Sequence, residues 1–348
     1  MRIAVDAMGG DHAPARIVDG ALAAARHLSI GVDLVGRTAA VRAELARHQD
    51  LGTLDIRVIE APDVIEMAEA PAQALRRKPR ASIRVAAELV ATGEAAALVS
   101  AGHTGAAIVA AHGAFGMLPG VDRPALAPSV PTRNGSAVLL DAGATIECKP
   151  AYLLQFGVMG SVYARAWMGL EQPRVGLLSI GEEASKGNEL TREAHQLLRA
   201  SSLHFIGNVE ARDIFAGHAD VIVCDGFTGN VALKLCEGLV EMVEDLLGEE
   251  LQSTFSSQMG YLLSRRAFRR FRKRVDYSEY GGAPLMGVAG LCIVGHGRSS
   301  AKAVRNAVVM ASRFVGSNVL SRVEQEIAAV AARPAGQPRC SDSAVTKP

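Results

Sequence analysis

Short apolar runs alternate with amphipathic stretches along most of this 348-residue chain. The run at residues 3–5 is followed by a double glycine, Gly9 and Gly10, and then by an amphipathic stretch at residues 15–27. A short apolar run, a glycine break and a helical apolar period indicate a strand, a loop and a helix. Apolar runs predict further strands at residues 33–35, 56–59, 95–99, 137–140, 175–179, 204–206 and 221–223.

Alanine-rich helical patterns, such as residues 84–91 and 106–114, separate many of the predicted strands. This alternation favours an α/β fold, in which a doubly wound, largely parallel sheet carries helices on both faces. Hydrophobic residues make up 49% of the chain, which is enough for a large core. No Pro/Ser-rich linker interrupts the body. Residues 1–330 are therefore expected to form a single domain, and residues 331–348 a disordered tail.

Composition and charge narrow the function classes. The net charge is +1 and the aromatic content is 4%, so nothing favours a nucleic-acid partner. The five cysteines include no C-x-x-C pair, which suggests neither a disulfide framework nor a zinc site and fits a reducing cytosol. Neither a leader pattern nor an apolar run of about 18 residues is found. A cytoplasmic location is expected.

The first glycine loop carries Asp6, Gly9, Gly10, Asp11 and His12. Ligands of α/β proteins collect where strands end, and glycines let backbone N–H groups approach an anion closely. Asp11 is expected to cap the following helix. An ordinary tight turn between strand and helix is the alternative, and for an isolated Gly-Gly it has similar weight. Both acids are expected to orient the loops rather than touch an anion, because like charges repel.

A second loop repeats this arrangement directly before the helix predicted from residue 106. Its members are Ser100, Gly102, His103, Thr104 and Gly105. Donors at a helix N-terminus suit a phosphate or a carboxylate, since the helix dipole adds about half a positive charge. The alternative is simple capping by Ser100 and Thr104.

Two further loops follow later predicted strands. Residues 180–189 place Lys186 among acids and glycines without the order of a P-loop, so nucleoside triphosphate binding finds no support, although Lys186 could meet a small anion. The alternative for Lys186 is a solvated loop lysine. Residues 224–231 bring together Asp225, Thr228, Gly229 and Asn230 at the start of a helix.

The fifth loop, at residues 295–300, contains His296 in a G-x-G-x-x-S pattern. An acidic residue about twenty positions on, which would hold a ribose, is missing, so an NAD-dependent dehydrogenase is the minor interpretation. Neither G-x-S-x-G nor H-E-x-x-H occurs, which argues against a covalent serine hydrolase and a zinc enzyme. No metal and no cofactor are expected.

Taken together and in order, these loops resemble the phosphate acyltransferase family (PlsX), over roughly residues 1–325. The resemblance rests on residues 4–14, 100–105, 181–187, 224–230 and 276–282, and on 123–126, 140–144 and 159–161 between them. It implies transfer of a long-chain fatty acyl group from acyl carrier protein to inorganic phosphate, giving acyl phosphate for phospholipid synthesis. It also implies a homodimer with a Rossmann-like fold akin to isopropylmalate dehydrogenases and phosphotransacetylases.

The residues agree with that chemistry. Phosphate is already an anionic nucleophile and a thiolate is a tolerable leaving group, so no catalytic triad is needed. Lys186 and Asn230 match the family's functional lysine and asparagine, which predicts phosphate binding by Lys186 and an oxyanion or phosphate hydrogen bond from Asn230. His296 is a candidate acid for the leaving group. Position 103 is His where many relatives carry Asn, so its role could be that of a neutral donor or a pH-sensitive one.

Residues 251–275 form the main charge asymmetry of the chain, with seven basic residues, no acid and apolar residues at helical spacing. A basic amphipathic helical insertion is expected, able to lie on an anionic membrane or receive acidic acyl carrier protein. Packing on a dimer mate is the alternative. The resemblance implies peripheral membrane association, with a downstream glycerol-3-phosphate acyltransferase as a candidate partner. A membrane-surface scaffold without activity stays an alternative function. The contact residues proposed are Arg265, Arg266, Arg269, Arg270 and Lys273.

Overall fold

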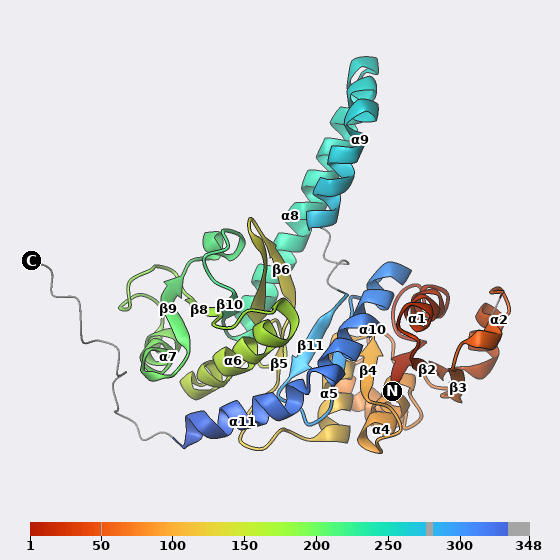
Figure 1. Ribbon diagram of the computed structural model, residues 1–348, viewed down its shortest axis with the longest axis horizontal. Helices are drawn as coiled ribbons and strands as arrows, with labels where there is room; N and C mark the ends of the chain where they lie inside the picture. The colour runs from red at the N-terminus through yellow and green to blue at the C-terminus, as the bar shows by residue number, and fades with distance from the viewer. Residues whose placement is uncertain (50, 276–280, 333–348) are drawn as a thin grey trace, which may run out of the picture.

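The computed structural model describes residues 1–49, 51–275 and 281–332, without the side chains of 272–275. Most of the predicted tail, and residues 276–280 of one family motif, lie outside the described residues. The strands form a seven-stranded and a five-stranded sheet (Figure 1). The first sheet has the order β3 (Ile56–Glu60), β2 (Gly31–Gly36), β1 (Arg2–Asp6), β4 (Ala97–Ser100), β12 (Cys292–Val294), β11 (Ala283–Met286), β5 (Ala125–Leu126). The second has the order β6 (Ser129–Thr132), β7 (Gly135–Leu140), β10 (Val221–Val223), β8 (Arg174–Leu178), β9 (His204–Val209).

Most neighbouring strands are parallel, as predicted. Only β11, with its two neighbours, and β6, against β7, pair antiparallel among the described strands. The eight apolar runs predicted as strands all form strands, with ends that coincide or differ by one to three residues. Parallel strands that are buried on both faces need continuous apolar side chains, which is why these strands could be predicted from apolar runs in the sequence.

Helices cover both faces of the first sheet. The side chains of Ile3 and Val5 enter one buried cluster with helices α1 and α10, whereas Ala4 between them enters another with α4 and α5. Successive strand residues point to opposite faces, so this alternation proves that the sheet is doubly wound. The helices of the body are α1 (Ala15–Leu28), α2 (Thr38–Leu45), α3 (Pro71–Arg77), α4 (Ser82–Ala91), α5 (Thr104–Phe115), α6 (Pro150–Tyr163), α7 (Glu189–Ala200), α10 (Ala301–Gly316) and α11 (Val319–Ala331), with short turns η1 (Leu51–Thr53), η2 (Ala164–Met168) and η3 (Ala211–Phe215).

The two sheets share one hydrophobic core cluster. Phe314 of α10 packs edge-on against Tyr163 of α6, with ring centroids 5.2 Å apart, and against Trp167, at 5.9 Å. An ion pair between Arg165 and Glu326 of α11 lies beside these rings. The carboxyl ends of strands in both sheets are therefore held at fixed places relative to each other. The assignment of residues 1–330 to one domain stays a prediction.

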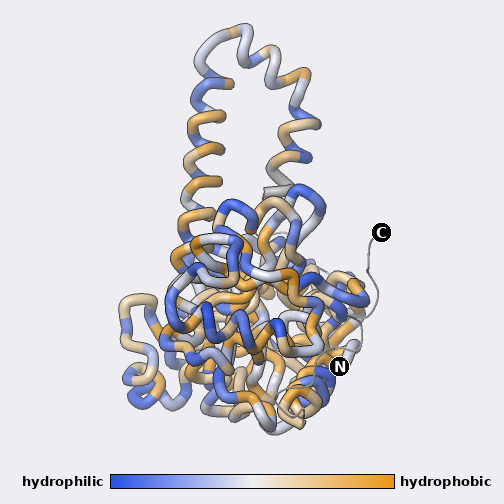
Figure 2. Tube along the Cα trace, turned by 90° about the vertical axis from the view of Figure 1, so that its left-hand side faces the viewer, coloured by the Kyte–Doolittle hydropathy of each residue, from blue (hydrophilic) through white to orange (hydrophobic). Residues whose placement is uncertain are grey.

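A hairpin of two long helices, α8 (Gly226–Ser253) and α9 (Phe255–Val275), projects from the body (Figures 1 and 2). The prediction of one helical insertion at 251–275 is wrong at its start, since residues 251–253 end α8. Thr254 has extended backbone, and its Oγ1 accepts a hydrogen bond from Ser257 N at 3.1 Å, which caps α9. Among the described helices, none combines the length and apolarity needed to cross a bilayer.

Candidate active site

Three of the predicted loops meet at the carboxyl edge of the first sheet. They follow β1, β4 and β12, which are neighbours in that order. Asp11 N donates to Gly297 O at 2.9 Å, and Gly295 N donates to Ser100 O at 2.7 Å. Gly10 has φ +104°, and a Cβ there would lie 2.8 Å from the carbonyl oxygens of both Ala101 and Gly297. Only glycine allows the three loops to approach this closely.

Asp6 lies beneath this cluster of loops and holds two of them. Its Oδ2 accepts a hydrogen bond from Ser100 Oγ at 2.7 Å, and its Oδ1 accepts one from Met8 N at 3.2 Å. Burial raises the pKa of Asp6, and hydrogen bonds from Ser82 and Ser100 oppose the rise. A Cβ on Gly9 would lie only 2.6 Å from Asp6 Oδ2. The backbone of Gly9 therefore packs directly against the carboxylate. Asp6 therefore joins the loops after β1 and β4 through hydrogen bonds. Its expected role in orienting these loops around a ligand stays a prediction.

His103 is the N-cap of α5. Its Nδ1 accepts a hydrogen bond from Gly105 N at 3.1 Å, so the proton of the neutral ring is on Nε2, which is left as a donor. The capping by Ser100 and Thr104 that the sequence allowed is replaced by His103. Gly102 N donates to Ser100 Oγ at 3.2 Å, so that hydroxyl links both parts of the loop.

The prediction that Asp11 caps the first helix is wrong. Helix α1 begins at Ala15, its N-cap is Pro14, and no side chain caps it. Asp11 lies three residues before that cap, too far upstream for a carboxylate that must reach the first turn. Asp11 and His12 are instead exposed on the loop.

A second group of loops gathers at the carboxyl edge of the second sheet, where β7, β10 and β8 pair parallel. The buried Asp141 follows β7. Its Oδ1 accepts hydrogen bonds from the backbone N–H groups of Leu126, Gly143 and Ala144, and its Oδ2 accepts one from Thr145 N at 2.6 Å. Burial raises the pKa of Asp141 to about 6, although these four donors oppose the rise. Asp141 thus fixes the shape of its loop.

The loop after β10 starts α8 and packs on the Asp141 loop. Asp225 caps the helix, since its Oδ1 accepts from Thr228 N at 2.9 Å and its Oδ2 from Thr228 Oγ1 at 2.7 Å. A Cβ on Gly229 would lie 1.9 Å from Asp141 O. Asn230 follows directly, and its Cβ is 3.6 Å from the position of a Cβ on Gly143. Gly229 therefore permits a close approach that sets the position of Asn230.

Lys186 lies on the exposed loop after β8, beside the β10 loop. Lys186 N donates to Glu183 O at 3.0 Å, and the same carbonyl accepts from Asn208 Nδ2 at 2.9 Å. A Cβ on Gly181 would lie 2.9 Å from Lys186 Cγ, so the aliphatic part of the lysine side chain packs over Gly181. Within the described residues, neither Lys186 Nζ nor the Asn230 amide forms a hydrogen bond or ion pair. Both groups are available to a ligand.

Helix α8 connects the two groups of loops. Asn230, Lys234, Glu237 and Glu241 follow helical spacing along one face. Arg298 Nη2, from the loop after β12, pairs with Glu241 Oε1 at 2.9 Å. Burial raises the pKa of Glu237, and the charges of His296, Lys234 and Arg298 oppose the rise. His296 of the first sheet and Asn230 of the second therefore lie along the same side of α8.

Three residues of this arrangement were missed at the sequence level, namely Asp141, Ser82 and Glu237. Asp141 directly follows an apolar run, which is the signal that selected the other loops. Ser82 gave no signal, because its hydrogen bond to Asp6 joins residues 76 positions apart. Glu237 follows Asn230 at helical spacing, which could have indicated it.

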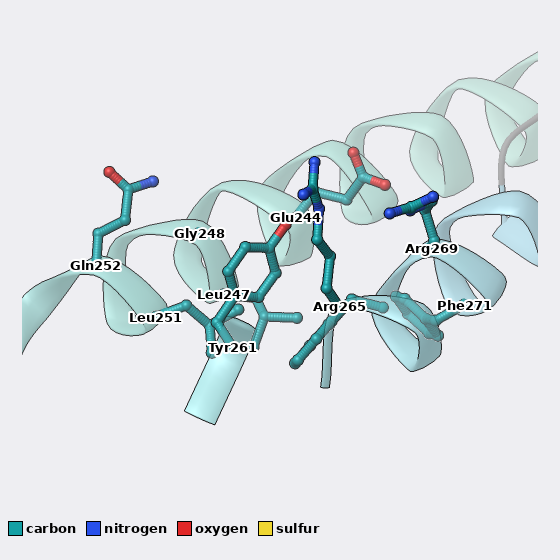
Figure 3. A pocket seen from close by; sticks show the side chains of 10 residues that line it. Glu244, Leu247, Gly248, Leu251, Gln252, Tyr261, Arg265, Arg269 and Phe271 are labelled. Carbon is teal, nitrogen blue, oxygen red and sulfur yellow. The ribbon is translucent and has the colours of Figure 1, made fainter. Parts of the chain in front are cut away.

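The basic segment does not lie at the loops. Arg265 and Arg269 line a groove of about 470 Å³ between α8 and α9, and Figure 3 shows the Glu244 side chain between them. Arg266 and Arg270 are exposed elsewhere on α9, and the Lys273 side chain is outside the described residues. The arginines therefore belong to the projecting hairpin.

Comparison with known proteins points to the same family as the sequence motifs, over almost the whole chain. A family model described as "Fatty acid synthesis protein" matches residues 1–322. The phosphate acyltransferase of Geobacter sp. (strain M21) is 53% identical over 327 residues, covering 94% of this chain and 93% of that protein. That of Geobacter sulfurreducens is 52% identical, covering 94% of each chain.

Solved structures support the fold. A phosphotransacetylase from Streptococcus pyogenes superposes with a TM-score of 0.61 at 17% identity, covering 90% of this chain and 94% of its own. A branched-chain phosphotransacylase from Enterococcus faecalis V583 gives 0.55 at 15% identity, covering 90% and 99%. The Rossmann-like α/β class is confirmed. On the identity and coverage of its relatives, this chain belongs to the phosphate acyltransferase (PlsX) family.

Proposed function

We propose that this protein transfers a long-chain fatty acyl group from acyl carrier protein to inorganic phosphate. A phosphate oxygen bonds to the thioester carbonyl carbon, the carbon–sulfur bond breaks, and the sulfur leaves with the proton that the phosphate carried. The products are an acyl phosphate, for phospholipid synthesis, and the carrier thiol. The phosphate acyltransferase names of the relatives support this reaction.

One observation carries the proposal: Lys186 and Asn230 follow neighbouring parallel strands, and neither polar group has a partner within the described residues. Lys186 binds the phosphate as a point charge. Asn230 donates to the oxyanion of the tetrahedral intermediate, where one donor is typically worth roughly 10²–10³ in rate. From the glycine loops of the first sheet, the Gly10 N–H and the Thr104 hydroxyl are proposed as further donors. The N–H groups of Gly9, Gly102 and Gly105 already donate within their own loops.

His296 is proposed to relay this proton: it protonates the departing sulfur and is reprotonated by the proton that the phosphate loses. Its Nδ1 accepts a hydrogen bond from Arg298 N at 3.2 Å, which leaves Nε2 to carry the proton. Glu237 of α8 lies close enough to interact electrostatically with it.

The test is incubation of purified protein with palmitoyl-acyl carrier protein and phosphate, followed by trapping of acyl phosphate with hydroxylamine. Phosphate-dependent hydroxamate is expected at a similar rate from the wild type and from Arg212→Met, an exposed cation of the same half, and at a rate roughly 10–100-fold lower from Lys186→Met at subsaturating phosphate. Absence of hydroxamate from the wild type would sink the proposal. NAD reduction, or membrane binding without turnover, would support the dehydrogenase or the scaffold instead.

We also propose that the hairpin forms a homodimer. Apolar residues recur along α8 at helical spacing and are exposed, with Leu235 at 71% and Leu239 at 54%, and Figure 2 shows hydrophobic positions repeated along this arm. A soluble monomer rarely leaves such a stripe uncovered. Light scattering should give a dimer mass, and a monomer mass for Leu235→Glu with Leu239→Glu. A wild-type monomer would contradict the proposal.

Peripheral membrane association is the proposed role of the rest of the hairpin. Leu263 is 83% exposed and Phe255 is 80% exposed near the turn between the helices, with the arginines behind them. Apolar residues beside cations suit an anionic bilayer surface, near which each Arg contributes about 1 kcal/mol. Arg269→Glu with Arg270→Glu should abolish flotation with anionic liposomes. If flotation is unchanged and acyl carrier protein binding is lost, the arginines bind acyl carrier protein and not the membrane. A glycerol-3-phosphate acyltransferase stays a candidate partner at the membrane.

A further inference from the structure

An open groove of about 740 Å³ lies beside the loops of the candidate active site. One wall is helix α5, and the other is the chain from Ala144 to Tyr152, which begins next to the Asp141 loop. None of the functional residues proposed above lines it. Its lining combines exposed apolar side chains with cations, which is unusual for a surface that only contacts water.

The groove leads directly out of the site. Thr104, Ile108 and His112 follow each other on α5 at four-residue spacing, so they share one face. Thr104 belongs to the second glycine loop, whereas Ile108 and His112 line the groove. On the opposite wall, Thr145 O accepts from Gly226 N at 2.9 Å, at the first turn of α8 before Asn230. Both walls therefore begin at the candidate active site.

The charges of the groove favour an anion. Arg123 and Lys149 line it against one carboxylate, Glu147. Lys149 Nζ lies 6.0 Å from the ring centroid of Tyr152, which holds the ammonium beside the groove.

Apolar side chains are exposed on both walls of the groove. Ile146, on the loop wall, is 64% exposed, and Val109, on α5, is 39% exposed. An extended organic chain could cover both. The groove is open, and its cations would lie beside a fatty tail, so it does not suit the acyl chain itself.

We propose that this groove binds the phosphopantetheine arm of the acyl donor, with the arm's phosphodiester at Arg123 and Lys149. The inference rests on the proposed acyl transfer and extends it to the donor's recognition. Thr104 and His112 are eight residues apart, about 12 Å along the helix. The arm has about thirteen bonds from sulfur to phosphorus, equivalent to about four peptide residues, or roughly 14 Å extended. With its thioester beside Thr104, the arm is thus long enough to extend along the α5 wall of the groove as far as His112.

The experiment compares the double variant Arg123→Gln/Lys149→Gln with the wild type and with a control, Arg47→Gln, which lies just beyond the C-terminal end of α2. Three donors are used: lauroyl-pantetheine, lauroyl-4′-phosphopantetheine and lauroyl-acyl carrier protein. For the wild type, kcat/KM should be roughly tenfold higher with the phosphorylated arm than without it, since exposed ion pairs are each worth only a few-fold. The double variant should lose this advantage through KM and keep its kcat. Its activity with lauroyl-pantetheine should not change.

Three outcomes would overturn the inference. The double variant could keep the advantage of the phosphorylated arm; it could lose activity only with acyl carrier protein, so that the cations dock the carrier; or it could lose activity equally with all donors. Ile146→Ser should weaken both small donors, because it removes the apolar wall. Calorimetric binding of 4′-phosphopantetheine and pantetheine gives the same comparison without turnover. A wild type that binds the phosphorylated arm tightly yet makes no acyl phosphate would contradict the proposed function and leave the groove assignment standing.

Discussion

Substitution of Gly229 by Ala tests whether the catalytic rate depends on the close approach of α8 to the Asp141 loop. The new Cβ would lie 1.9 Å from Asp141 O, 2.8 Å from Cys224 Sγ and 3.0 Å from Asp141 C. To reach an ordinary contact of 3.4 Å, the helix or the loop must move by about 1.5 Å. The obstructing atoms are mainly backbone, and four hydrogen bonds to the Asp141 carboxylate fix that backbone. The first turn of α8, with Asn230, is therefore expected to shift.

Both activity and stability should respond. A displacement of about 1 Å at a catalytic group can cost roughly 10² in rate, so kcat for hydroxamate formation is expected to fall about a hundredfold. Overpacking costs about 1–3 kcal/mol, offset by about 1 kcal/mol from replacing a helical glycine. The melting temperature should fall by only a few degrees.

Gly113→Ala on α5 is the matched control, because nothing lies within 4 Å of its added Cβ. It is expected to keep full activity and gain up to about 1 kcal/mol of stability. If Gly229→Ala also kept full activity, the contact with Asp141 would not position Asn230, and the account of this half of the site would be refuted.

Three other substitutions probe individual groups. Lys186→Met should lower kcat/KM for phosphate roughly 10–100-fold, because one charged hydrogen bond is lost. The value is measured by varying the phosphate concentration, and an unchanged value would show that Lys186 does not bind phosphate. Asn230→Ala should lower kcat by about 10²–10³ at saturating donor, with stability unchanged by thermal denaturation. Asp141 has a native pKa of about 6 against 3.8 unfolded, so the folded protein binds the extra proton between those values. Its contribution to the free energy of unfolding therefore falls as pH rises from about 4 to 6, by about 3 kcal/mol, and urea unfolding of wild type and Asp141→Asn should diverge across that range.

Much of the fold was predictable because its signal is local. The central strands of both sheets are buried on each face, and such a strand stands out as a continuous apolar run, as at Val221–Val223. The loops were predictable from the same pattern, since parallel strands end at one edge of a sheet. The contact between Asp11 and Gly297 follows from that geometry, although 286 residues separate them.

The supporting contacts could not be predicted, because they depend on packing between distant segments. In the sequence, nothing distinguishes Gly229 from the other loop glycines. Only the structure shows that the Asp141 carbonyl oxygen packs against it. Ser82 bonds to Asp6 only because α4 packs on β1. The end of α8 was also missed, since apolar spacing continues from Leu251 through Met259 while the backbone turns at Thr254.

Helix α8 ties the proposed site and the proposed membrane contact to one rigid element. It carries Asn230 in its first turn and ends at Ser253, which places the turn of the hairpin about 35 Å from Asn230 along the helix. A bilayer touching Leu263 would therefore not reach the candidate active site. The proposed reaction does not require it to, because the proposed acyl donor is a water-borne carrier protein and phosphate is dissolved. The hairpin's proposed role is then to keep the enzyme near the surface where its product is consumed, and charge reversal on α9 should abolish flotation without lowering kcat.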